Sequence, residues 1–150
     1  MKTAHLIFWI ATLVLSAGPL ATSAAETGVV LESASIVPGA AGEARLFLVI
    51  NNLSANPVTL TAVDSPVASE VILVRSSGEP VIAGAIVPPH SELYMQPGTV
   101  HIVVRGLSAP LEVGSTFPLS LFVDGGAAVA AIARVVDDET ALPDHHYYQH

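Results

Sequence analysis

The feature that most constrains the fold of this chain is a series of short apolar runs between residues 29 and 123. The runs are rich in Val, Ile and Leu, and Pro, Gly or Asn separates each from the next. Runs of this length are typical of β-strands and short for helices. Strands are expected at residues 29–36, 44–52, 58–63, 70–75, 100–105 and 116–123. This pattern predicts an all-β sandwich.

Three turn signals predict where the chain reverses direction. The Pro-Pro pair at residues 88–89 excludes a helix and a central strand there, because proline lacks the N–H that both require. The Pro-Gly pair at 97–98 suits a type II turn, in which glycine tolerates the positive φ. Asp-Gly-Gly at 124–126 is a hairpin signal. Ala127–Val136 contains enough alanine for a helix, but its place after this hairpin and its Val and Ile residues favour a closing strand.

The first 25 residues have the features of a secretory signal peptide. Lys2 gives the charged start, Leu6–Leu15 forms the apolar run, and Ala21–Ala25 contains the small residues of a cleavage zone. The apolar run is too short for a membrane-spanning helix. We therefore expect export to the periplasm and removal of residues 1–25. One domain, residues 26–136, and a tail, residues 137–150, would remain.

Charge and residue inventory exclude several classes of function. Without residues 1–25, four arginines face all 13 acidic residues, so the surface repels nucleic acid and anionic lipid. The sequence has no cysteine, so no disulfide supports the fold and no thiol nucleophile is present. It also has no G-x-S-x-G elbow and no phosphate-binding loop. We expect neither an enzyme nor a nucleic-acid partner, and no membrane span in the mature chain.

Two stretches together resemble a known family. LYMQPGTVHIVVRGL, residues 93–107, is followed by APLEVGSTFPLSLFVDGG, residues 109–126. With residues 46–73, LFLVINNLSANPVTLTAVDSPVASEVIL, they resemble the periplasmic copper chaperones of the PCu(A)C family. The resemblance implies a cupredoxin-like antiparallel Greek-key β-sandwich.

The same resemblance implies a copper site, of which this sequence keeps one residue. The family holds copper with two His and two Met, two of them as His-x-Met on one strand, where period-two alternation points both side chains to one face. His101 fills the His position, but Val103 stands where the Met would be, and Val74 stands at or near the first His. The family's first Met would fall between Gly78 and Pro88, where there is none.

Met95 and His90 are candidates to complete this site. Met95 precedes His101 across the Pro-Gly turn, so the two would approach each other if they flank a hairpin. His90 lies on the loop leading into the same region. Thioether and imidazole suit Cu(I) in a chain without cysteine. In the alternative interpretation, Met95 fills a gap near the sandwich rim, His101 forms a local hydrogen bond and His90 is solvated.

The tail is a second candidate metal site. It is acidic at first and then rich in His and Tyr, and it has no apolar periodicity, so a flexible segment is expected. His145, His146 and His150 follow Asp144, and this ligand set suits Cu(II), Ni(II) or Zn(II). The alternative is a solvated tail without a ligand.

Two functions follow from these patterns. The resemblance implies a periplasmic copper-binding chaperone that delivers copper to an exported cuproenzyme such as cytochrome c oxidase. The alternative is a copper-free interaction module that has kept the sandwich and lost the metal site. Val74 and Val103 favour the alternative, whereas His101 and the tail histidines favour the chaperone.

Overall fold

The structure is a computed structural model, and it describes residues 28–143. Its elements are strands except for one short 3-10 helix, so the predicted all-β fold is confirmed. The elements are β1 (Val29–Pro38), β2 (Ala44–Asn52), β3 (Val58–Asp64), β4 (Ala68–Val74), β5 (Ala85–Val87), β6 (Ser91–Tyr94), β7 (His101–Leu107), β8 (Thr116–Val123), β9 (Ala127–Val135) and η1 (Glu139–Ala141). The alanine-rich closing segment is a strand, as predicted. The two short strands β5 and β6 were not predicted.

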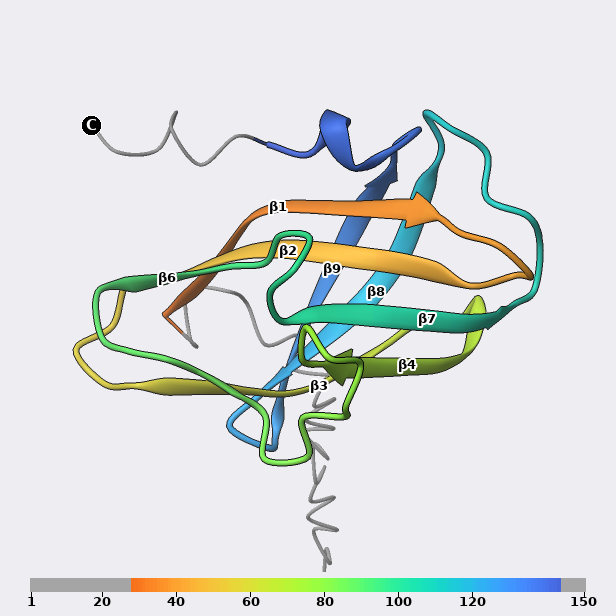
Figure 1. Cartoon of the computed structure of the whole chain (residues 1–150). Coiled ribbons are helices and arrows are strands. Elements are labelled where there is room, and N and C mark those ends of the chain that lie inside the picture. Colours follow the sequence, from red (N-terminus) through yellow and green to blue (C-terminus); the bar gives the residue numbers. More distant parts are fainter. Residues whose placement is uncertain (1–27, 144–150) are drawn as a thin grey trace, which may run out of the picture.

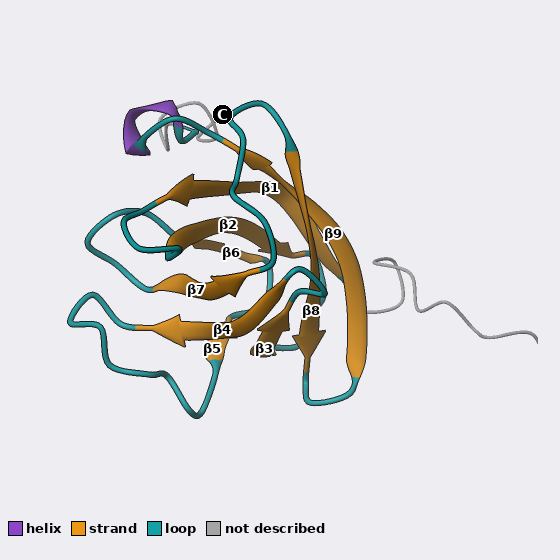
Figure 2. Ribbon diagram, turned by 90° about the vertical axis from the view of Figure 1, so that its right-hand side faces the viewer, coloured by secondary structure: helices purple, strands orange, loops and turns teal. Residues whose placement is uncertain are grey.

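The strands follow one path of hydrogen-bonded neighbours, β4-β7-β2-β1-β9-β8-β3-β5, and β6 pairs with β2 beyond the end of β7. The path folds over on itself: β1, β2, β7 and β4 form one layer, and β8 and β9 cross steeply behind it (Figures 1 and 2). All pairings are antiparallel except that of β1 with β9, where Ser35 and Ile36 lie beside Arg134 and Val135. The purely antiparallel arrangement that we expected therefore has one parallel contact, which joins the first strand to the last.

The core lies between the two layers and is built from alternate residues of the strands. Phe117 and Leu121 from β8 belong to the same core cluster as Leu46 and Leu48 from β2, and all four are fully or almost fully buried. Strand β2 is unusual because its other face is covered as well: Phe47 and Val49 are also buried. This second buried face carries the candidate site.

Asn52 explains how the chain passes from β5 to β6 despite two prolines. Its side chain is completely buried, and its Nδ2 donates to the carbonyl oxygens of Asn56 at 2.8 Å and Val87 at 3.0 Å. Its Oδ1 accepts from the backbone N–H of Ser54 at 3.0 Å. These bonds replace the ladder bonds that Pro88 and Pro89 cannot make. No helix among residues 28–143 is long and apolar enough to cross a membrane.

Candidate metal site

His101 is positioned by the turn that precedes β7. Gly98 has a φ of 84°, and the N–H of Thr99 donates to the carbonyl of Gln96 at 3.1 Å, as the predicted type II turn requires. The turn brings the carbonyl oxygen of Thr99 to 2.9 Å from Nδ1 of His101. A carbonyl only accepts, so Nδ1 carries the proton and the lone pair of the neutral ring lies on Nε2. This tautomer is the one that metal-binding histidines adopt when Nε2 is the ligand.

The imidazole of His101 lies in an apolar frame. It stacks on Phe47 of β2, with 5.8 Å between ring centroids and 27° between the planes. Its cross-strand partner on β4 is Val74, and Val103 lies two residues along on the same face. Val74 and Val103 are buried and His101 is half-buried. The positions at which the resemblance places ligands therefore adjoin one another, but two of them hold valine.

Met95 lies on the opposite face of β2 from His101. Its N–H donates to the carbonyl of Leu48 at 2.9 Å, and its side chain is 2% exposed within the core cluster that includes Leu48. His101 instead contacts Phe47. Phe47 precedes Leu48 on β2, so its side chain points to the opposite face from that of Leu48. The expected approach of Met95 to His101 is therefore wrong, because a strand's alternation directs the two side chains to different faces.

His90 is also distant from His101. It is exposed, has a φ of 51°, and its N–H donates to the carbonyl of Ser54 at 3.2 Å. It precedes Ser91, which pairs with Asn52 at the far end of β2. Five residues separate that end from Phe47, or about 17 Å along the strand. The structure thus does not bring His90, Met95 and His101 together, and residues 28–143 contain no cluster of three or more His, Asp or Glu that could hold a metal.

Residues 137–143, the first half of the tail that was predicted to be flexible, contain η1 and contact two strands. Asp138 caps η1 by accepting from the N–H of Thr140 at 2.9 Å, and hydrogen bonds from Thr140 lower the pKa of the Asp138 carboxyl. Glu139 forms an ion pair with Arg45 of β2. The hydroxyl of Tyr94 donates to the carbonyl of Pro143. Sequence patterns missed the contacts with Arg45 and Tyr94 because each joins the segment to a strand distant in the chain.

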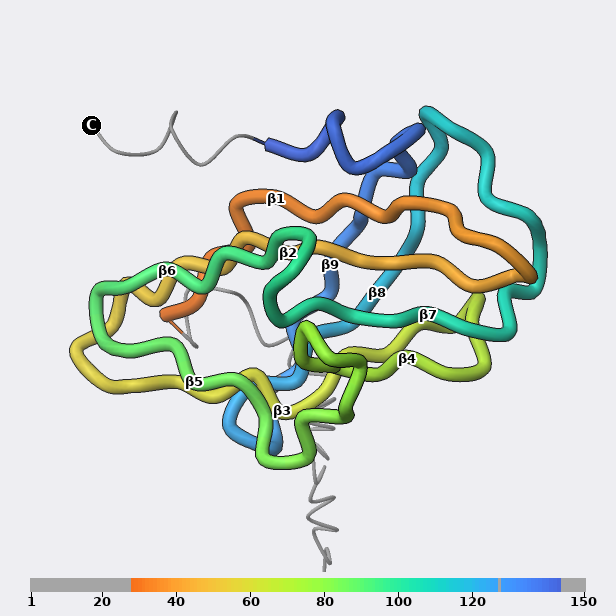
Figure 3. The backbone as a smooth tube through the Cα atoms, viewed as in Figure 1, coloured from red at the N-terminus to blue at the C-terminus, as the bar shows by residue number. Residues whose placement is uncertain are grey.

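These contacts place residues 137–143 across the face of β2 that carries Phe47. Arg45, Phe47 and Val49 alternate onto this face, and Tyr94 pairs with Val49. Figure 3 shows the segment running beside β1, in the direction of the side on which β6 lies. Asp144, His145, His146 and His150 lie outside the described residues, so their predicted metal site stays a prediction. The described chain nevertheless ends beside the layer that holds His101.

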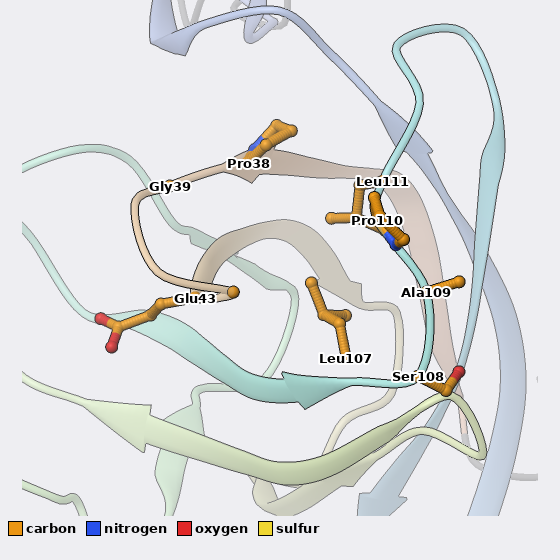
Figure 4. A pocket seen from close by; sticks show the side chains of 9 residues that line it. Pro38, Gly39, Glu43, Leu107, Ser108, Ala109, Pro110 and Leu111 are labelled. Carbon is orange, nitrogen blue, oxygen red and sulfur yellow. The ribbon is translucent and has the colours of Figure 1, made fainter.

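A groove lies at the other end of β7 and is separate from His101. Pro38, Leu107, Pro110 and Leu111 line it, with Glu43 at its edge (Figure 4), and its volume is about 390 Å³. The Glu43 carboxylate accepts from Nε of Arg105 at 3.1 Å, and this bond raises the pKa of the guanidinium. The groove is mainly apolar and supplies no set of metal ligands.

Comparison with known proteins identifies the family. The family model described as "Putative lipoprotein LpqE-like" matches residues 25–135. The chain belongs to the LpqE-like family. One relative, "Putative lipoprotein Lxx21020" of Leifsonia xyli subsp. xyli, is 28% identical over 113 residues, which are 70% of this chain and 68% of the relative.

Solved structures place this LpqE-like domain among the PCuAC domains by fold. The copper-bound PCuAC domain from PmoF2 superimposes with a TM-score of 0.65 and 22% identity, covering 74% of this chain and 94% of that domain. The Cu(I) form of DR1885 from Deinococcus radiodurans gives a TM-score of 0.61 and 22% identity, covering 71% and 76%. The predicted resemblance to the PCu(A)C family is confirmed at the level of the fold, and this sequence lacks the His/Met set of that family.

Proposed function

We propose that this LpqE-like protein is an exported copper-binding protein whose ligands differ from those of the PCu(A)C chaperones. The observation that carries the proposal is the orientation of His101: the Thr99 carbonyl binds Nδ1, so Nε2 has its lone pair available. The copper-bound PCuAC domain from PmoF2 has this fold, and this supports copper as the metal.

His101 alone is an incomplete site. Met95 is in the core, and Val74 and Val103 cannot coordinate a metal. We propose that His145, His146 and His150 supply the main ligands for Cu(II), and that residues 137–143 keep these histidines attached to the layer that holds His101. Delivery to an exported cuproenzyme such as cytochrome c oxidase in the periplasm is the further part of this proposal.

Calorimetric titration of Cu(II) tests the proposal. The purified chain is compared with a variant that ends at Pro143, which keeps the contacts of Glu139 and Tyr94. We expect the shortened chain to lose most Cu(II) binding and to keep its circular dichroism. A control in which His145, His146 and His150 are replaced by Asn keeps the length and should lose binding equally. Equal Cu(II) affinity in all three proteins would reject the assignment to the tail.

A copper-free interaction module remains the second candidate, and one observation favours it. Val74 is the cross-strand neighbour of His101, and Val103 is its neighbour on the same strand. Both positions hold buried apolar side chains where a metal site would need ligands. If neither Cu(I) nor Cu(II) binds to the purified chain, this function replaces the first.

A further inference from the structure

The outward face of β8 and β9 is made of small or apolar side chains. Inward residues of β8, such as Phe117 and Leu121, are buried in the core, so the alternate residues face outwards. The outward positions are Pro118, Ser120 and Phe122 on β8 and Ala128, Ala130 and Ile132 on β9. Ile132 is 66% exposed. We call these six residues the β8–β9 face; it lies on the side of the molecule opposite the β2 layer (Figure 2).

A sheet face in contact with water normally carries polar side chains. The β8–β9 face carries none with a charge, whereas the sequence as a whole has 13 acidic residues and five basic ones. A contiguous exposed apolar surface with charges at its edge is typical of a protein-binding site. This face is therefore a candidate interface.

The charges at its edge are of opposite sign and lie on opposite sides of Pro118. Arg134 on β9 pairs with Thr116, which lies two residues before Pro118 on β8. Asp64 on β3 pairs with Ser120, which lies two residues after Pro118 on β8. Both charged residues are exposed, and neither forms an ion pair within residues 28–143. The edge is thus positive at one corner and negative at the corner diagonally across.

This arrangement is self-complementary under two-fold rotation. An axis that runs over Pro118, perpendicular to the line from Arg134 to Asp64, exchanges the two positions between facing copies. Each Arg134 would then lie over the Asp64 of the facing copy, and the strands of the copies would cross steeply, as in orthogonal sheet packing. Two-fold dimers use one surface on both subunits, so a surface that complements itself fits a second copy of the same chain.

We propose that the β8–β9 face binds a second copy of this chain and forms a two-fold symmetric dimer. Pro118 lies at the axis, Ile132 packs against the facing sheet, and Arg134 pairs with the partner's Asp64. The small side chains of Ser120, Ala128 and Ala130 permit close approach of the two sheets. The face that carries His101 belongs to the other layer and remains accessible in such a dimer.

Sedimentation equilibrium of the purified chain tests the dimer. We expect the mass to rise from monomer to dimer with concentration, and Ile132→Glu to remain monomeric because a charge would be buried in the contact. The matched control is Ile82→Glu, which makes the same change at an isoleucine that is 95% exposed outside this face. It should dimerise like the parent. A parent that is monomeric at every concentration, or equal masses for the two variants, overturns the proposal.

Charge reversal tests the geometry. Arg134→Asp and Asp64→Arg should each weaken the dimer about tenfold, because a dimer contains two such pairs at its rim. The double variant should restore the parent affinity, since it exchanges the two charges. Additive weakening in the double variant would refute the two-fold arrangement.

The absence of cysteine allows a direct proximity test. Pro118→Cys lies at the axis and should form an intermolecular disulfide under mild oxidation, whereas Ser76→Cys, on the exposed turn after β4, should not. The alternative occupant of the face is the segment before residue 28. If Pro118→Cys instead cross-links to a second cysteine introduced before residue 28 of the same copy, the dimer proposal is overturned.

Discussion

Val74 lies directly opposite His101 on neighbouring antiparallel strands, and both side chains point to the same face. An imidazole at position 74 would therefore lie within the short cross-strand distance at which two side chains can share one metal ion. The backbone still has the register of a two-ligand site, although the side chains do not supply it.

Val74→His should create a paired-histidine site. We expect affinity for Co(II) or Cu(II) to rise at least about tenfold over the parent, because the second ligand binds as part of the same molecule. The measurement is calorimetric titration in the variant that ends at Pro143, where the tail histidines do not contribute. Val113→His, at a valine that is 60% exposed and away from His101, is the control. An equal effect at both positions would show that the register of β4 and β7 is irrelevant to binding.

Met95 should behave as a core residue and not as a ligand. Met95→Ala should lower the free energy of unfolding by about 2–4 kcal/mol, since it leaves a cavity beside Leu48. Met95→Leu conserves volume and should cost less than about 1.5 kcal/mol. Urea denaturation measures both. Cu(I) affinity should be unchanged in Met95→Leu; a clear loss there would return Met95 to the ligand set.

Gly84 is required by close backbone contact. A Cβ at this position would lie 2.6 Å from the carbonyl oxygen of Leu60, and its φ is +82°. Gly114 has a similar φ of +87° but nothing within 4 Å of its Cβ position, so it isolates the effect of φ. Gly114→Ala should cost about 1 kcal/mol and Gly84→Ala about 3 kcal/mol of unfolding free energy. Thermal denaturation measures both losses. If the two variants lose similar unfolding free energy, β3 can move away from the added methyl group at position 84.

The cap of η1 should respond to acid. Hydrogen bonds from Thr140 lower the pKa of Asp138 below its ordinary 3.8, so the cap is complete above that value and is lost as pH falls through the lowered pKa. The amide shift of Thr140, followed by NMR, should titrate with a midpoint below 3.8. Thr140→Val removes the hydroxyl donor and should move the midpoint of the Asp138 carboxyl back towards 3.8. An unchanged midpoint would show that the side-chain bond is not formed.

Strand positions were largely predictable from the sequence, because alternation and turn residues are local signals. Ala44–Asn52 and Thr116–Val123 were predicted with the bounds that the structure gives. The strand Ser91–Tyr94 was missed, since a short run between two prolines and a Pro-Gly turn has no clear period. Its pairing with β2 depends on Asn52, a buried polar side chain that no local pattern reveals.

The candidate site was less predictable than the fold. His101 was found from the resemblance to the PCu(A)C family, in which a His follows the Pro-Gly turn. Phe47 was not found, although its burial could have been inferred from the uninterrupted apolar run LFLVI. Met95 was a candidate ligand only if it flanked a hairpin with His101, and sequence distance does not specify which way a side chain points. The contacts of residues 137–143 were missed because the acidic composition of this segment gives no indication of Arg45 and Tyr94 as partners.

The parallel contact between β1 and β9 has a consequence for how the protein reaches its native state. Ser35 and Arg134 are separated by nearly the whole length of the domain, so the sheet cannot close until the last strand is available. If the amino terminus becomes available first, the edge of β1 that pairs with β9 stays unpaired until Val135 is available. Contacts so distant in sequence slow folding, because a large loop must be ordered before they form. Such a delay means that the native sheet is completed by the last strand of the domain and not during synthesis of the earlier ones.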